Sequence, residues 1–184
     1  MIETIYINET TRLIVEHDLD AQNPREDFDC FNTGVVTADN YSRFNKVPEV
    51  HPDPTGSITE AHSRLSTDLV IRWARTFHGL TLVWDWQYRA YWFVSPEGLA
   101  ETGCISLDEE TDLKIIALDM ETYRRWADGE VYGVILEKSA VWKKEGHDDE
   151  QVLWESEESI WGCYLDDDYT ARDVAAESWN EVTQ

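Results

Sequence analysis

The feature that most restricts what this chain can fold into is its charge. Its 38 Asp and Glu residues outnumber its 15 Lys and Arg residues, and the formal net charge is −23 over 184 residues. Like charges repel, so a compact state requires enough buried apolar surface to offset that repulsion. Nine Trp, eight Tyr and five Phe provide it, because large aromatic side chains bury the most area per residue. We therefore expect a folded protein, whereas acidic chains poor in aromatic residues are typically disordered.

The length favours a single domain over residues 1–184, with a proline-rich loop at 45–56. No apolar run is long enough to span a membrane, and the N-terminus lacks a basic segment followed by an apolar one. The three cysteines, Cys30, Cys104 and Cys163, are far apart and odd in number. This pattern is typical of reduced thiols, and we expect a cytoplasmic protein.

Three segments have helical patterns. Ser57–Glu60 matches a capping box, and apolar residues then recur every three or four positions as far as Phe77, before Gly79. A second capping-box match at Ser106–Glu109 opens a stretch of helical character that continues, with breaks, to Asp128 and ends at Gly129. The segment 168–179 is amphipathic, with its apolar residues on one side.

The strand patterns come in neighbouring pairs. We expect strands at 11–17, 34–37, 80–86, 90–95 and 131–137, followed by 151–157 and 160–165, either as two strands or as one strand bent at Glu158. Neighbouring strands joined by short turns form hairpins. The sequence therefore predicts an α+β fold, with a largely antiparallel sheet built from hairpins and packed with two to four helices.

Catalytic patterns are weak in this sequence. The five histidines are scattered, no nucleophile motif is present, and the acidic clusters at 17–20, 147–149 and 166–168 lack the spacing of known metal loops. The aromatic run from Trp84 to Phe93 could stack on a ligand, but its alternation favours a core role. We expect a protein that is not an enzyme and that uses neither a metal nor another cofactor.

Three segments together resemble a family of uncharacterised small acidic proteins encoded by phages of Gram-positive and actinobacterial hosts. They are Asn23-Pro24-Arg25-Glu26 with Phe28-Asp29, Asp128-Gly129-Glu130-Val131-Tyr132-Gly133, and Ser159-Ile160-Trp161-Gly162-Cys163-Tyr164. The resemblance implies a phage origin and action in the cytoplasm of a bacterial host. The family has no assigned reaction, so the resemblance implies no catalytic residue.

The charge is concentrated near the C-terminus. Residues 145–177 contain twelve carboxylates and a single basic residue, Arg172, a balance of −11 out of −23. A surface of this kind can occupy the basic groove of a nucleic-acid-binding protein. The predicted binding residues are its carboxylates and nearby aromatic residues: Glu150, Glu155, Glu157, Glu158, Asp166, Asp167, Asp168, Trp154, Trp161 and Tyr164.

The leading hypothesis is a DNA-mimic-like inhibitor that acts against a host factor such as a nuclease, a restriction enzyme or a CRISPR effector. One alternative is a metal-dependent small hydrolase, or a ligand-binding protein, that acts on a nucleotide. Another is a phage accessory protein whose charge serves only solubility or adaptation to salt. The sequence leaves the partner and the oligomeric state open.

Overall fold

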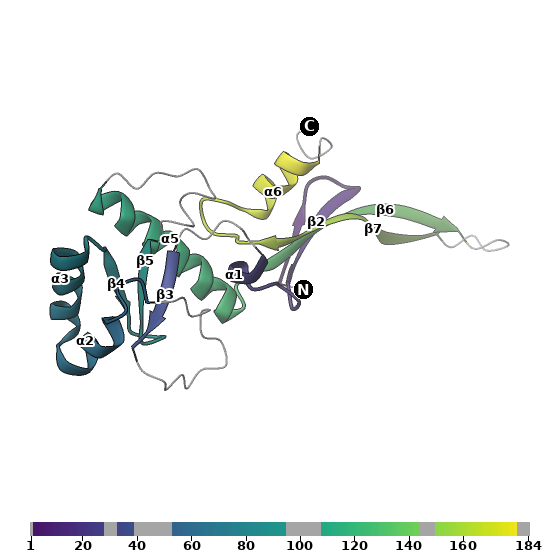
Figure 1. Cartoon of the computed structure of the whole chain (residues 1–184). Coiled ribbons are helices and arrows are strands. Elements are labelled where there is room, and N and C mark those ends of the chain that lie inside the picture. Colours follow the sequence, from purple (N-terminus) through teal and green to yellow (C-terminus); the bar gives the residue numbers. More distant parts are fainter. Residues whose placement is uncertain (1, 28–32, 39–52, 95–107, 144–149, 180–184) are drawn as a thin grey trace. The chain divides into compact units, whose positions relative to one another are not determined.

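The computed structural model describes residues 2–27, 33–38, 53–94, 108–143 and 150–179 (Figure 1). Most of the loop expected at 45–56 lies outside these ranges. The chain forms two compact units: unit 1 comprises Met1–Gln22 and Asp128–Gln184, and unit 2 comprises Asn23–Ala127. Each unit contains an antiparallel sheet, packed with one helix in the described part of unit 1 and with several helices in unit 2. The predicted α+β class is therefore confirmed.

Unit 1 is built on a four-stranded sheet in the order β1-β2-β6-β7. The strands are β1 (Glu3–Tyr6), β2 (Thr11–His17), β6 (Tyr132–Lys143) and β7 (Glu150–Cys163), and every pair is antiparallel. The segment predicted as two strands, or as one bent strand, is a single strand. β7 has two register shifts against β6, between Leu136 and Glu137 and between Tyr132 and Val134. Glu157 is the extra residue of the first bulge, next to the expected bend at Glu158.

One helix covers a face of this sheet. α6 (Ala171–Ser178) packs Val174 and Ala175 against Leu13, Val134 and neighbouring buried side chains. Its N-terminus carries a capping box between Thr170 and Asp173. The apolar side predicted for the last helix is therefore the side that forms the core of unit 1.

Unit 2 is built on a three-stranded sheet in the order β3-β5-β4. The strands are β3 (Thr33–Thr37), β4 (Leu82–Asp85) and β5 (Ala90–Val94). All five residues of β5 are buried, because Trp92 packs in the cluster that contains Tyr123 of α5 (Glu109–Asp128), while Tyr91 and Phe93 pack in a separate cluster. The core role predicted for the aromatic run is confirmed for the β5 residues, whereas Trp86 is exposed.

The second cluster of unit 2 includes residues from two short helices, α2 (Ile58–Arg64) and α3 (Thr67–His78). The sequence suggested one helix with one apolar face from Ile58 to Phe77, and this prediction is wrong. The backbone is extended at Leu65 and Ser66, and α3 buries Val70 and Ala74. A break in a helix rotates the pattern that follows it, which leaves Leu69 and Phe77 exposed and Trp73 half-buried against the core.

The helix ends also differ from the expected capping boxes. The Ser57 side chain makes no cap hydrogen bond, and instead Asp53 Oδ2 accepts the Ile58 N–H at 2.5 Å. A carboxylate is a stronger acceptor than a hydroxyl for an amide of the first turn. Ser106 lies outside the described residues, and Asp108 Oδ1 accepts the Thr111 N–H at 2.8 Å at the start of α5. The chain also forms a single-turn helix, α1 (Pro24–Asp27).

Candidate binding surface

β7 is an edge strand of the unit 1 sheet. Together with β6, it continues past the end of β2. β2 pairs with β6 only as far as Lys138, whereas β6 pairs with β7 up to Lys143 and Glu150. Figure 1 shows β6 and β7 continuing beyond the end of β2 as a two-stranded ribbon. We call this ribbon the arm and define it as residues 140–143 and 150–153. A two-stranded ribbon is marginally stable alone in water, so its conformation depends on the sheet from which it extends.

The arm exposes four large apolar side chains. The exposed fractions are 64% for Val141, 56% for Trp142, 61% for Val152 and 44% for Leu153. Val141 lies opposite Val152 on one face, and Ala140 lies opposite Leu153 on the other. Both faces of the arm are therefore apolar and open, which is typical of a surface that becomes buried against another molecule.

The four predicted glutamates of β7 are all exposed, but they do not lie on a single face. Glu155 and Glu158 lie opposite Lys138 and Leu136 on the face that α6 covers in part, whereas Glu150 lies on the other face. Glu157 is in the bulge. A strand of 14 residues is roughly 45 Å long, so these carboxylates form a line along an edge.

Two of these glutamates have partners on β6. Glu150 Oε1 lies 3.7 Å from Lys143 Nζ, and both side chains are more than half exposed. Glu155 Oε1 accepts the Trp142 Nε1–H at 3.2 Å. Among the described residues, no ion pair involves Glu157 or Glu158. These two carboxylates are the ones most available to a basic partner.

The three aspartates Asp166, Asp167 and Asp168 lie in the loop between β7 and α6, at the opposite end of β7 from Glu150. Asp166 Oδ1 accepts the N–H groups of Asp168 and Tyr169 at 2.9 and 2.7 Å. This carboxylate therefore shapes the loop. Asp167 and Asp168 are exposed. The structure thus separates the aspartates from the start of β7 and does not join all seven predicted carboxylates into one cluster.

The predicted aromatic anchors have different environments. Trp154 is half-buried, and the Arg12 guanidinium lies 4.3 Å from its ring centroid. Arg12 also binds Glu137, with its Nε 2.7 Å from Oε2, so Trp154 is part of a packed cluster on the sheet. Trp161 is 48% exposed, and its ring lies over Gly133. Tyr164 is half-buried, which leaves Trp161 as the most exposed of the three.

Trp142 is an exposed aromatic residue of the arm that the predicted binding site did not include. It pairs with Gln151 in the arm and exposes more of its surface than Trp161. The two runs of three consecutive apolar residues, Ala140–Trp142 and Val152–Trp154, could have indicated it, because a strand with such a run has apolar side chains on both faces. The sequence could not show that these strands extend beyond the rest of the sheet.

The ionisable groups near this surface have structural roles. Burial raises the pKa of the Cys163 thiol, and the nearby Asp18 carboxylate raises it further, so the thiol stays protonated near neutral pH. Asp18 Oδ2 accepts the Gly162 N–H at 3.1 Å. In the part of the chain that the structure describes, no three His, Cys, Asp or Glu side chains are grouped to hold a metal ion. The cluster at 147–149 lies outside that part.

Comparisons with known proteins found no match to a family model, to a curated protein or to a solved structure. Across the described residues, the structure contains no helix that is long and apolar enough to cross a membrane.

Proposed function

We propose that this chain is a non-enzymatic binding protein that occludes a basic, nucleic-acid-binding surface of another protein. The observation that carries the proposal is the arm, which extends beyond the sheet, is apolar on both faces and continues into an edge strand with exposed glutamates. Apolar side chains at the centre of an interface supply most of the affinity, and charges around them speed association.

The apolar residues of the arm and the glutamates of β7 have different proposed roles, which follow from their positions. Trp142, Val152 and Leu153 lie at the end of the ribbon, where a groove can enclose them from both sides. Glu157 and Glu158 lie further along the same strand and are exposed. The carboxylates therefore attract a basic surface over a distance, and the arm tip is buried once contact is made.

The similarity to DNA on which this proposal draws is limited to charge sign and linear arrangement. The β7 glutamates lie between positions 150 and 158, roughly 26 Å at about 3.3 Å per residue, or one carboxylate per roughly 7 Å. Duplex DNA carries one charge per about 1.7 Å of its axis. We therefore expect the partner to bind this protein with a weaker dependence on salt than it binds DNA.

The nature of the partner is part of the proposal. The sequence resemblance implies a phage origin, and a small phage protein would then act on a bacterial nuclease, restriction enzyme or CRISPR effector. Nothing in the described residues favours the alternative of a metal-dependent hydrolase that acts on a nucleotide.

The accessory-protein alternative does have an observation in its favour. Charged side chains on an exposed edge strand prevent pairing with the edges of other sheets, and the β7 glutamates are so placed. This role explains the glutamates without any partner. It does not explain the exposed apolar residues of the arm, because those residues increase the risk of aggregation.

Affinity capture from a bacterial lysate at low and high salt tests the proposal. The key variant is Glu157→Lys/Glu158→Lys, and the matched control is Glu9→Lys/Glu130→Lys, which changes two exposed unit 1 carboxylates outside β7 by the same charge. We expect a nucleic-acid-binding protein to be captured at low salt and lost with the β7 variant and with Trp142→Ser, but kept with the control. Equal loss with the β7 variant and the control would show that only net charge matters and would contradict the proposal.

A further inference from the structure

The segment that forms α2 and α3 is less acidic than the chain as a whole. Residues 57–79 contain three arginines, Arg64, Arg72 and Arg75, and two carboxylates, Glu60 and Asp68, for a local balance of +1 in a chain of net charge −23. All three arginines are exposed. At physiological ionic strength the Debye length is about 8 Å, so a molecule in contact with this surface interacts mainly with these local charges.

The same surface has a partly exposed apolar stripe, which we define as Leu65, Leu69, Trp73 and Phe77. The last three are spaced by four residues, which places them along one side of α3. Trp73 is half-buried and packs against a core cluster of unit 2, whereas the other three side chains are exposed. Leu69 is 48% and Phe77 is 74% exposed, while Val70 and Ala74 form the buried face of the helix. From Leu69 to Phe77 the stripe is roughly 12 Å long at about 1.5 Å per residue, and of its residues Trp73 also packs against the core of unit 2.

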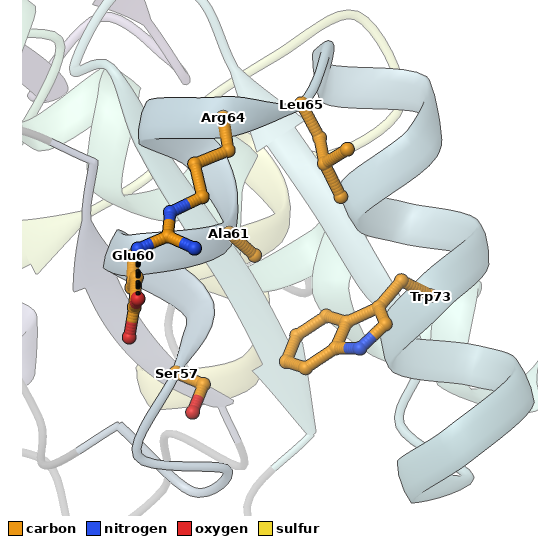
Figure 2. Close-up of a pocket in the computed structure, with 6 residues that line it drawn as sticks. All are labelled: Ser57, Glu60, Ala61, Arg64, Leu65 and Trp73. Atoms are coloured by element: carbon orange, nitrogen blue, oxygen red, sulfur yellow. Dashed lines mark ion pairs between the residues drawn. The ribbon is translucent and has the colours of Figure 1, made fainter.

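A pocket lies at one end of the stripe, between the two helices (Figure 2). Its volume is about 250 Å³, and it is lined by Ser57, Glu60, Ala61, Arg64, Leu65 and Trp73. Figure 2 shows Leu65 and Trp73 between α2 and α3, with Arg64 and Glu60 along α2. Leu65 and Trp73 thus belong to both the stripe and the pocket. An apolar side chain that enters the pocket can continue its contacts along the stripe.

We propose that the α2–α3 surface docks an acidic amphipathic helix of a second protein. The stripe and the pocket fit apolar anchors at successive turns of such a helix, which is a common mode of peptide recognition. The arginines fit carboxylates on either side of those anchors. This site lies in unit 2 and shares no residue with the arm or with β7.

The arginines differ in how readily they can form new ion pairs. Arg72 lies three residues from Leu69, so it is next to the stripe, and it has no ion pair among the described residues. Arg64 forms an exposed pair with Glu60 at 2.7 Å, which a competing carboxylate can replace at little cost. Arg75 pairs with Glu109 of α5. Arg72 and Arg64 are therefore the arginines that contact the carboxylates of the docked helix.

The test uses a synthetic acidic helical peptide with leucines at every third or fourth position and glutamates between them. A scrambled peptide of identical composition has the same charge but no apolar stripe. Binding to the full chain is measured by fluorescence anisotropy, and the amide NMR signals of α2 and α3 show whether the peptide binds there. The variants are Arg64→Glu/Arg72→Glu and Phe77→Ser. Trp86→Ser is the matched control, because Trp86 is another exposed aromatic residue of unit 2 that lies outside the stripe.

We expect the patterned peptide to bind at least about tenfold more tightly than the scrambled one, since only the former has apolar anchors in register. Reversing two exposed charges replaces attraction with repulsion and weakens binding by about tenfold or more. Trp86→Ser leaves the affinity unchanged, and so does the β7 variant Glu157→Lys/Glu158→Lys, which separates this site from the arm. Equal binding of the two peptides, absence of binding, or insensitivity to Arg64→Glu/Arg72→Glu would overturn the proposal.

Discussion

Two strand glycines lie beneath aromatic rings, and they make a matched pair for testing the packing of the two sheets. A Cβ atom built on Gly34 would overlap the ring of Phe93, its cross-strand neighbour. A Cβ atom built on Gly133 would overlap the ring of Trp161 in the same way. The two rings differ in their surroundings, because Phe93 is 4% exposed and Trp161 is 48% exposed. Replacing glycine with alanine should therefore change the free energy of unfolding by different amounts at the two positions.

In Gly34→Ala the Phe93 ring has no free space to enter, so the extra methyl group overpacks the core. Overpacking costs about 1–3 kcal/mol, and replacing glycine with alanine in a strand regains about 0.5–1 kcal/mol of backbone entropy. The added Cβ atom would overlap three atoms of the Phe93 ring, so the overpacking cost belongs in the upper half of its range, about 2–3 kcal/mol. The net destabilisation expected is then about 1–2.5 kcal/mol. In Gly133→Ala the Trp161 ring can move into solvent, and we expect the free energy of unfolding to change by about 0.5 kcal/mol or less.

Urea unfolding followed by circular dichroism measures both free energies. Quenching of the total tryptophan fluorescence by acrylamide should increase in Gly133→Ala, because Trp161 is the ring that moves further into solvent. If Gly34→Ala were as stable as the original protein, or if both variants lost equal stability, the packing described for Phe93 and Trp161 would be refuted.

Three further outcomes follow from the structure. The fully buried Asp85 carboxylate accepts the N–H groups of Gln87 and Tyr88 and pairs with Arg124 at 3.0 Å. Asp85→Ala should therefore lower the free energy of unfolding, measured in urea, by about 2–3 kcal/mol. A loss below about 1 kcal/mol would contradict this network. The hydrogen bonds from Thr170 lower the pKa of Asp173 below its usual value, so its stabilising effect is present above the unfolded-state pKa and is lost as the pH falls through the folded-state pKa. Asp173→Asn should therefore have a lower free energy of unfolding than the original protein at pH 7, and this difference should become smaller in acid. A difference in free energy of unfolding that is constant with pH would exclude the cap. Cys163 should react with iodoacetamide more slowly than free glutathione does at pH 8, because burial raises the pKa of its thiol. Mass spectrometry of the labelled peptides measures the rate of the reaction. Equal rates for Cys163 and glutathione would contradict that burial.

Features set by local patterns were predicted well from the sequence. The segment Thr11–His17 is a strand with the bounds expected, and the apolar side of the last helix packs in the core of unit 1. In both cases the side-chain pattern matches the period of the element that forms. The alternation in the aromatic run favoured a core role, and Tyr91, Trp92 and Phe93 are all buried, although burial on both faces of β5 was not predicted.

Features that depend on tertiary contacts were not predictable in the same way. Leu65, Leu69 and Phe77 have the spacing of a buried face, but the break at Ser66 turns a different face of α3 to the core. The length of the arm depends on pairing between distant strands, so Trp142 was missed as a binding residue. A count of carboxylates also does not reveal that Asp166 shapes a loop while Glu157 and Glu158 remain available.

The central proposal is that the acidic strand and the arm occupy the surface with which a partner binds nucleic acid. The most direct test is a titration of this protein into a complex of the captured partner with labelled DNA, followed by fluorescence anisotropy. The proposal predicts that the protein releases the DNA competitively, that Glu157→Lys/Glu158→Lys and Trp142→Ser weaken the release, and that Glu9→Lys/Glu130→Lys does not. A ternary complex in which the partner keeps its DNA would contradict it.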